Sequence, residues 1–309
     1  GPDVFRPALG DYIATFADKA ADSDDFFRVI GQATDNPEIG KSLKSFVAQN
    51  GVPLLDAELQ CAESGAKVAL DQSRYRPLGS TIDPNRLWTI PVCISWQEGD
   101  KSGRSCSLLA SEHAVVPLSG ATCPDVYHPN AGGTGYYRFA LADRGWAKLA
   151  DALPDMEAGE ALTALDSGMA AFAAGRLDAS MLRRLLASAS ANTNPTVAGT
   201  VIDAYTGLME RLAGAPAEGL SADALAMSDA MRARIATDPS NMGLKSRLDA
   251  FDATVLKRDD TRARLAREID AWLGNPSADS GLSGDLFAPA LSVFLDEGGM
   301  TAYNRVLAA

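Results

Sequence analysis

The chain has 309 residues, a length typical of two or three domains, and its 46% hydrophobic and 22% charged residues make an ordinary globular composition. This composition excludes a disordered chain, a collagen and a small disulfide-stapled scaffold, and no apolar run is long enough for a transmembrane helix. The net charge of −12, with an acidic balance in both halves, argues against binding to nucleic acid or to an anionic membrane, because both need a basic surface.

Residues 3–50 are expected to form short helices. Gly1 and Pro2 follow no initiator Met and are typical of the scar left by a tag-cleaving protease, so Asp3 is expected to be the first natural residue. No signal peptide is visible, which says nothing about location. Apolar residues recur at helical spacing in three segments, and Ser23 is predicted to cap the second. The segments are 5–16, 23–30 and 37–47. Three short helices are too few for an independent domain and indicate the end of a larger one.

Residues 51–140 are expected to form a small antiparallel β-sandwich, because the hydrophobic period changes from helical to two. Turn-like residues at 97–102 predict a hairpin between two of the strands. About six strands are predicted, at 55–61, 68–74, 88–96, 104–109, 113–118 and 136–141.

All four cysteines lie in this β region, at 61, 93, 106 and 123. Their spacing does not fit a four-cysteine zinc site, which needs close pairs. If Trp96 faces Gly103 across the hairpin, then Cys93 faces Cys106, within reach of a disulfide. Cys61 and Cys123 would form the second pair, and the protein would then mature in an oxidising compartment. The alternative is four reduced cysteines that serve as small apolar core residues.

Residues 141–309 are expected to form some eight or nine helices with short loops, either a bundle or a curved stack of helical hairpins. No clean fixed-period repeat supports a regular solenoid. Apolar faces occur at Met181, Leu182, Leu185 and Leu186, at Leu244, Leu248, Phe251 and Val255, at Leu265, Ile269 and Trp272, and at Leu291, Phe294 and Leu295. Turn-like separators are expected at 194–195, 214–216, 238–240 and 274–276.

The two histidines, His113 and His128, exclude most hydrolytic sites. A zincin helix needs two histidines four residues apart with a Glu between them, and this chain has no such motif. It also has no Gly-x-Ser-x-Gly nucleophile elbow. We therefore name no catalytic and no metal-ligating residue, and each histidine is expected to be an ordinary strand or loop residue.

The nucleotide-binding and acidic motifs are also absent or explained by local structure. The Gly-Lys-Ser at 40–42 lacks the first glycine of a phosphate loop, and the glycines at 131–135 lack the third glycine of a dinucleotide fingerprint. The acidic pairs at 24–25 and 259–260 both stand at predicted helix starts, where carboxylates favour the helix dipole.

Three segments carry a resemblance to a known family. The first joins Gly-Val-Pro at 51–53 to Gln-Ser-Arg-Tyr at 72–75, the second is Trp-Thr-Ile-Pro at 88–91, and the third is 130–138, which ends in Gly-Tyr-Tyr-Arg. In order and spacing they resemble the C-terminal half of M1-family (gluzincin) zinc aminopeptidases. The residues that match the family's structural motifs are Gln72, Arg74, Trp88, Pro91, Asn130, Gly135, Tyr136, Tyr137, Arg138 and Trp146.

The resemblance implies that 3–50 are the last helices of a truncated catalytic domain, 51–140 the sandwich domain and 141–309 the C-terminal helical domain. The family's His-Glu-x-x-His and Gly-x-Met-x-Asn motifs are absent. The chain is therefore expected to hold no cofactor, with the zinc in the missing catalytic domain, and to be inactive alone. It would act as a scaffold and as a lid that limits access of peptide substrates, and its partner would be its own catalytic domain. The cysteine pattern resembles the secreted bacterial branch, which implies a periplasmic or secreted protein.

Two other interpretations stay open. The chain could be a stand-alone module that binds a protein or peptide without catalysis, or an enzyme of an unrecognised type. A fragment should expose apolar side chains within 3–50, with Phe5, Phe16, Phe26 and Phe27 as candidates. A stand-alone module should cover them.

Overall fold

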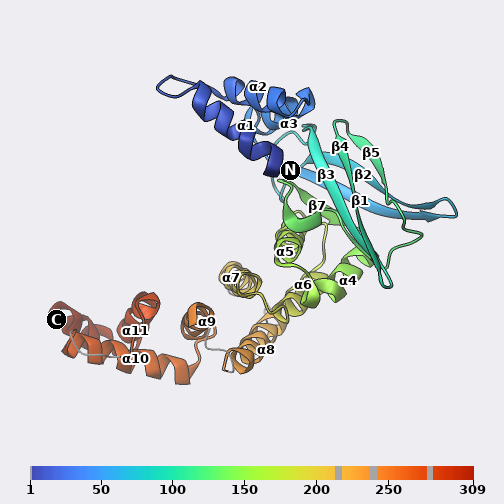
Figure 1. Ribbon diagram of the computed structural model, residues 1–309. Coiled ribbons are helices and arrows are strands. Elements are labelled where there is room, and N and C mark those ends of the chain that lie inside the picture. Colours follow the sequence, from blue (N-terminus) through green and yellow to red (C-terminus); the bar gives the residue numbers. More distant parts are fainter. Residues whose placement is uncertain (1, 213–217, 237–241, 277–280) are drawn as a thin grey trace. The chain divides into compact units, whose positions relative to one another are not determined.

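The computed structural model describes residues 2–212, 218–236, 242–276 and 281–309 (Figure 1). Two of the expected separators, 214–216 and 238–240, lie outside the described residues. The chain divides into two compact units, each described by itself below. The first comprises residues 1–149 and 163–181, and the second comprises 150–162 and 182–309. Helices predominate and the sheets are small, which confirms the predicted mixed, mostly α class.

Three short helices open the first unit, as the apolar spacing predicts. They are α1 (Pro2–Thr15), α2 (Ser23–Ala33) and α3 (Pro37–Val47). The N-cap of α2 is Asp22 rather than Ser23, so this detail of the prediction is wrong by one residue. The Asp22 carboxylate accepts from the Asp25 amide at 2.9 Å, and the Asp25 carboxylate accepts from the Asp22 amide at 3.4 Å. This reciprocal capping box satisfies two amides, which a single serine hydroxyl cannot do.

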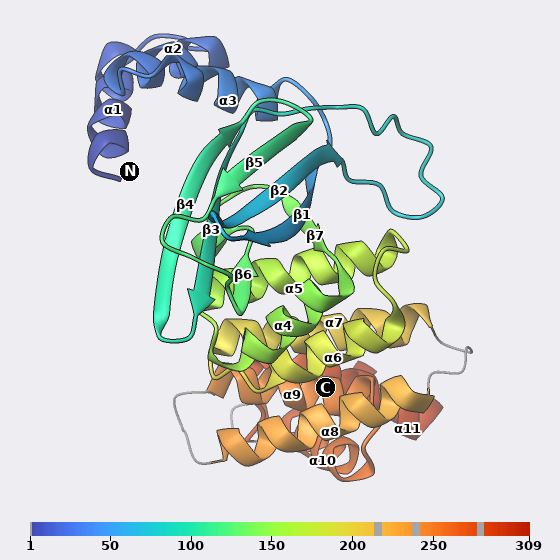
Figure 2. The ribbon, with the colours of Figure 1, turned by 90° about the vertical axis from the view of Figure 1, so that its right-hand side faces the viewer.

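Seven described strands follow, in two sheets (Figure 2). They are β1 (Pro53–Ala62), β2 (Gly65–Arg74), β3 (Ile90–Glu98), β4 (Lys101–Leu109), β5 (His113–Pro117), β6 (Val126–His128) and β7 (Arg138–Leu141). The strand orders are β5-β2-β1-β7 and β4-β3-β6. All pairs are antiparallel except β1 with β7, which is parallel and corrects the purely antiparallel prediction. Sequence reasoning missed β6, because three residues are too few to display an alternation. Face-to-face packing of the two sheets stays a prediction.

The β3–β4 hairpin has the predicted register. Trp96 lies opposite Gly103, and Cys93 lies opposite Cys106. A Cβ atom at position 103 would stand 2.4 Å from the Trp96 ring, so only glycine leaves room for the indole at this position. Trp96 is accordingly buried against the strand.

Eight α-helices complete the described residues and agree with the predicted number. They are α4 (Asp143–Ala152), α5 (Ala158–Ala173), α6 (Ala179–Ser190), α7 (Pro195–Arg211), α8 (Glu218–Ile235), α9 (Met242–Thr254), α10 (Asp259–Gly274) and α11 (Phe287–Leu307). From α7 to α11, each helix contacts the next one and most contact the one after it. This succession of contacts is typical of stacked helical hairpins rather than of a closed bundle.

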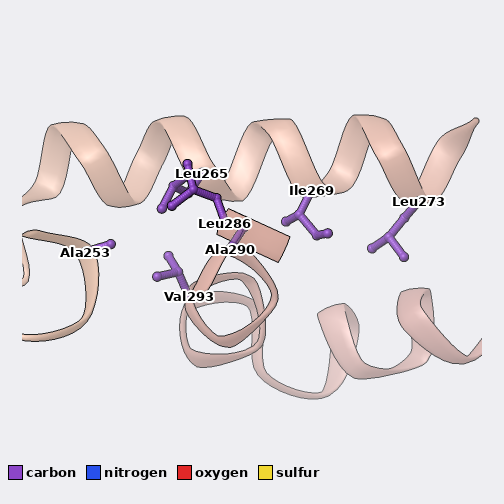
Figure 3. Packing of buried hydrophobic residues seen from close by; sticks show 7 residues of the cluster. All are labelled: Ala253, Leu265, Ile269, Leu273, Leu286, Ala290 and Val293. Carbon is purple, nitrogen blue, oxygen red and sulfur yellow. The ribbon is translucent and has the colours of Figure 1, made fainter. Parts of the chain in front are cut away.

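The end of the second unit has its own apolar core, drawn in Figure 3. Leu265, Ile269 and Leu273 recur at four-residue intervals, so they lie on one face of α10. They pack with Ala253, Leu286, Ala290 and Val293, from α9, α11 and the turn that precedes α11. The predicted apolar face of α11 is shifted by one residue, because Ala290 and Val293 are buried while Leu291 and Phe294 are half-buried beside them.

Arginine–carboxylate pairs link neighbouring helices of the second unit. The pairs are Arg184 with Asp151, Arg183 with Asp223, Arg247 with Asp203, Arg258 with Asp229, Arg232 with Asp252, Arg264 with Asp249, Arg262 with Glu297, and Arg305 with Asp270. Most are partly exposed, but the acidic partners Asp249 and Asp252 of α9 are 2% and 0% exposed. Asp252 accepts from the Ser228 hydroxyl at 2.6 Å and from Arg232 Nε at 2.6 Å, so this buried charge is compensated.

Candidate functional site

The motif residues meet in the first unit, and Gln72 stands at their centre. Its side chain is 3% exposed. The amide Nε2 donates to the Trp88 carbonyl at 3.1 Å and to the Ser111 carbonyl at 3.3 Å, while Oε1 accepts from the Trp88 amide. One glutamine therefore pairs both backbone groups of Trp88, whose indole is 1% exposed. Gln72 and Trp88, which are distant in sequence, are brought together as a single support between β2 and the start of β3.

Arg74 occupies the end of β2 and contacts the segment that leads into β1. Its Nη2 donates to the Asn50 side chain at 2.9 Å. A Cβ atom on Gly51 would lie 2.5 Å from Arg74 Nε, and Gly51 has a φ of +112°. Both the close approach and the positive φ require glycine here. The Gly-x-Pro and Gln-x-Arg elements of the first motif thus fit against each other.

Helix α3 is fastened to the same region by side chains that sequence reasoning missed. Ser42 Oγ donates to the Thr89 carbonyl at 2.7 Å, and Ser45 Oγ accepts from the Thr89 amide at 3.1 Å. Gln49 donates to the Leu87 carbonyl at 2.9 Å. Single polar residues on an amphipathic helix give no local signal of such partners. The bonds join α3 and the residues after it to the segment around Trp88. Figures 1 and 2 both draw α3 beside the strands.

Asn130 shapes the loop that precedes β7. Its side chain is buried, donates to the Gly135 carbonyl at 2.8 Å and accepts from the Gly135 amide at 2.8 Å. A Cβ atom on Gly135 would stand 2.2 Å from the Tyr137 ring, so glycine is required for this packing. The Tyr137 hydroxyl donates to the Pro129 carbonyl at 2.8 Å, and burial raises the pKa of this phenol well above its ordinary value.

Arg138 connects β7 to α5 and to the end of the first motif. Its guanidinium binds Asp166 through two hydrogen bonds, of 2.9 and 3.1 Å, and lies 4.4 Å from the centre of the Tyr75 ring. The Tyr75 hydroxyl donates to the Ala170 carbonyl of α5 at 3.2 Å. Partial burial raises the pKa of Tyr75 above its ordinary value. The planar guanidinium serves an ion pair and a cation–π contact at once, which a lysine could not reproduce.

The remaining motif residues lie at the margins of this arrangement. Trp146 of α4 is fully buried and stacks on Phe139 with 5.6 Å between ring centres. Tyr136 is 68% exposed, and its ring lies 6.1 Å from that of Phe46 in α3. Pro91 is an exposed residue of β3. Most of the motif residues thus act as structural connections, and none of them forms a nucleophile–base pair.

The four cysteines form two disulfides, which confirms the prediction that they are oxidised. Cys93 pairs with Cys106 within the hairpin, with 4.1 Å between Cα atoms. Cys61 pairs with Cys123 and fastens the β1–β2 hairpin to the loop before β6, with 5.3 Å between Cα atoms. Two disulfides indicate an oxidising environment.

The two histidines lie in different settings. His113 is exposed, and its Nδ1 contacts the Asp71 carboxylate, a hydrogen bond that raises the pKa of the imidazole. His128 is 2% exposed and packs edge-on against Phe139. Within the part of the chain that the structure describes, no three His, Cys, Asp or Glu side chains are grouped to hold a metal ion. No described helix is long and apolar enough to cross a membrane.

The N-terminal helices expose apolar side chains, although not all the predicted ones. Phe5 and Ile13 of α1 are 45% and 61% exposed, and Val47 of α3 is 65% exposed. Phe27 of α2 is buried, with 8% of its surface exposed. Phe16 and Phe26 are half-buried around Tyr12, whose ring centre lies 5.2 Å from that of Phe16 and 5.1 Å from that of Phe26.

Comparison with known proteins places this arrangement in a family context. Residues 126–309 match the family described as the ERAP1-like C-terminal domain. The "Probable M1 family aminopeptidase 1" of Encephalitozoon cuniculi is 28% identical over 149 residues, which cover 48% of this chain and 16% of that protein. The "Aminopeptidase M1-A" of Oryza sativa subsp. japonica is 25% identical over 230 residues, 71% of this chain and 25% of that protein. The "Aminopeptidase A" of Gloydius brevicauda is 24% identical over 152 residues, 48% of this chain and 16% of that protein. The chain therefore matches a quarter or less of the length of these relatives.

Proposed function

The chain belongs to the M1 aminopeptidase family, whose ERAP1-like C-terminal domain it carries, and we propose that it is the non-catalytic C-terminal part of a zinc-dependent metallo-aminopeptidase. The parent protein would remove N-terminal residues from peptides. The observation that carries this proposal is the family match over residues 126–309, joined to motif residues whose contacts are structural.

The zinc-dependent chemistry belongs to the parent, because the described residues do not fit a zinc ion. All four cysteines are in disulfides, and the two histidines have unrelated partners. A zinc site of the His-Glu-x-x-His type needs neutral imidazoles on one helix face. We therefore assign no step of peptide hydrolysis to this chain.

The exposed apolar side chains of α1 and α3 support a catalytic domain as the partner. Ile13 and Val47 leave most of their surface in contact with water, which a neighbouring domain of the same polypeptide would cover. The hydrogen bonds that join Ser42 and Ser45 to the Thr89 backbone would then transmit the position of the catalytic domain to the β region. The chain would in this way act as a scaffold.

The stacked helices support a role as a lid. Stacked helical hairpins build extended surfaces of the kind that enclose or exclude a polymer. In the parent, α5–α11 would restrict access to the active site and favour short peptides. The two disulfides support a periplasmic or secreted location for the parent, which we propose to be of the secreted bacterial type.

The experiment compares this chain with the full-length parent on leucine p-nitroanilide, with zinc present and then with a chelator. We expect turnover only by the full-length protein, abolished by the chelator. A second variant is the parent protein truncated before Asp259. Its ratio of long-peptide to short-peptide hydrolysis should be higher than that of the intact parent, because part of the lid is removed. Circular dichroism serves as the control for folding of that variant.

Chelator-sensitive turnover by the chain alone would overturn the non-catalytic assignment. An unchanged preference for short peptides in the shortened variant would overturn the lid. If the full-length protein shows no turnover either, the alternative of a peptide-binding module gains, and its test is capture of peptides by the isolated chain.

A further inference from the structure

A hollow of about 320 Å³ lies in the first unit, where β1, the loop before β6 and the start of α4 meet. Its volume is at the lower end of the range for small-molecule sites, about 300–1,000 Å³. The hollow contains none of the motif residues described above.

One wall of the hollow is cationic. Arg144 and Lys148 are four residues apart on α4, so both side chains lie on the same helix face. Both are exposed, and neither has an ion-pair partner among the described residues. This is unusual in a chain whose other helix arginines mostly pair with carboxylates.

Another part of the lining is acidic. Glu58 is exposed on β1 and has no ion-pair partner in the described ranges, and its charge contributes to raising the pKa of the neighbouring Tyr127, which burial raises most. Asp125 accepts from the Gly99 amide at 2.9 Å through one carboxylate oxygen. Glu98, close enough to interact with Asp125, adds a further negative charge behind this wall.

The rest of the lining is apolar and held in place. Leu59, Pro124, the Tyr127 ring and the Cys61–Cys123 disulfide contribute it. The Tyr127 hydroxyl donates to the Ala57 carbonyl at 2.9 Å, and Glu98 accepts from the amides of Thr122 and Cys123, each at 2.9 Å. The disulfide and these hydrogen bonds order the loop before any ligand arrives, so binding need not include the entropic cost of ordering it.

We propose that this hollow is a binding site for a free, zwitterionic α-amino acid with an apolar side chain. The ligand carboxylate binds Arg144 and Lys148, the ammonium group faces Glu58 and Asp125, and the side chain contacts Leu59 and Tyr127. A simple anion would meet the acidic wall, and a simple cation would meet the arginine and lysine. Only a ligand with both charges and an apolar part matches all three parts of the lining. The proposed site is inferred from the lining residues alone and does not depend on the proposed peptidase function.

The test uses isothermal titration of the isolated chain with three probes: leucine, N-acetyl-leucine and leucinamide. Leucine should bind saturably, and each probe that lacks one charge should bind roughly tenfold more weakly, as expected for the loss of one charge-assisted contact. No peptide substrate is present, so failure here leaves the peptidase proposal untouched. Absence of saturable leucine binding would overturn the site, and equal binding of N-acetyl-leucine would reduce it to an anion site.

Two substitutions test the cationic and the acidic part of the lining separately. Arg144→Gln and Glu58→Gln should each weaken leucine binding roughly tenfold. Glu58→Gln should not weaken the binding of N-acetyl-leucine, because this anionic probe has no ammonium group and is repelled by the acidic wall. Lys67→Gln and Glu63→Gln are matched controls, because both residues are exposed and lie outside the lining. Thermal unfolding shows that each variant is folded. If the control variants weaken binding as much as the lining variants, the effect is one of general charge and the assignment is wrong.

Discussion

The β region and the helical stack are held together by different means. In the β region, two disulfides cross-link the strands and the loop before β6, and all four cysteines of the chain lie there. In the second unit, arginines pair with carboxylates of neighbouring helices, from Arg183–Asp223 to Arg305–Asp270. Covalent links suit small sheets, because β4 and β5 expose most of their residues and contribute little core.

In the helical stack, the links are set by the distance between neighbouring helices. Helix axes lie about 8–10 Å apart, a distance that a long arginine side chain can span to reach an acid on the next helix. The two units should therefore respond to different perturbations. Reductant should weaken the first unit, and removal of single charges should weaken the second.

The largest expected effect comes from a buried charge of the second unit. Asp252→Ala leaves the buried Ser228 hydroxyl without its acceptor and removes one of the two buried carboxylates beside Arg232, the other being Asp249. We expect a loss of about 3–5 kcal/mol in the free energy of unfolding. Urea denaturation followed by circular dichroism measures it. Asp203→Ala is the matched control, because this acid is exposed and pairs with Arg247 at the surface, where about 0.2–1 kcal/mol is expected. Equal losses in the two variants would show that burial does not set the strength of these links.

Disulfide removal is the corresponding change in the first unit. Replacing Cys61 and Cys123 with serine should cost about 2–5 kcal/mol, because the denatured chain regains the freedom of a long loop. The bond closes a separation of 62 residues, against 13 for Cys93–Cys106, so the second pair should cost about 1 kcal/mol less. Calorimetry should show the first unit unfolding earlier while the second is unchanged. A matching shift of the second unit would mean that the two are coupled.

Alkaline pH should affect both units, with a steeper fall in the first. Burial raises the pKa of Tyr205 to about 12 and raises those of Tyr127 and Tyr137 further. A neutral phenol is favoured in the folded state, so the stability is fully present below pH 10, the unfolded pKa, and falls as the pH rises above it. Each tyrosine contributes a slope of up to about 1.4 kcal/mol per pH unit. The first unit has Tyr127, Tyr137 and the less buried Tyr75, so its slope should be at least double that of the second unit.

Tyr205→Phe tests whether ionisation of this tyrosine causes the alkaline loss of stability in the second unit. The Tyr205 hydroxyl has no hydrogen-bond partner among the described residues, so the variant should be nearly as stable at neutral pH. Its second unit should no longer lose stability between pH 10 and 12. Unfolding curves at pH 8, 10 and 11 measure this, and an unchanged slope would assign the alkaline loss to other groups.

The smallest expected effect is that of salt on the exposed ion pairs. At about 1 M salt the screening length is about 3 Å, so pairs such as Arg184–Asp151 should lose most of their attraction, about 0.2–1 kcal/mol each. The first unit also has exposed pairs among the described residues, such as Lys44–Asp24 and Arg176–Asp56, so the loss should be small and similar in both units. Sodium chloride is the appropriate salt, since sulfate would also strengthen apolar burial. A loss of several kcal/mol in either unit would contradict the small contribution expected of exposed pairs.

Much of the fold could be predicted because its signals are local. The period of two across residues 53–74 and the helical spacing of Leu265 and Ile269 follow directly from strand and helix geometry. The Cys93–Cys106 register followed from the hairpin loop. The motif resemblance identified Gln72, Asn130 and Arg138, although spacing alone said nothing about what these side chains contact.

The amino-acid sequence by itself determined the fold class, the hairpin register, the oxidisable cysteines and the family, because each depends on short-range spacing or on a motif read in order. Only the tertiary structure decided that Asp252 is buried while Asp203 is exposed, that Phe27 is covered while Phe5 is not, and that Arg144 and Lys148 line the same hollow as Glu58. The physical reason is that burial and electrostatic partnership depend on which distant elements pack together, and local periodicity carries no information about the neighbour.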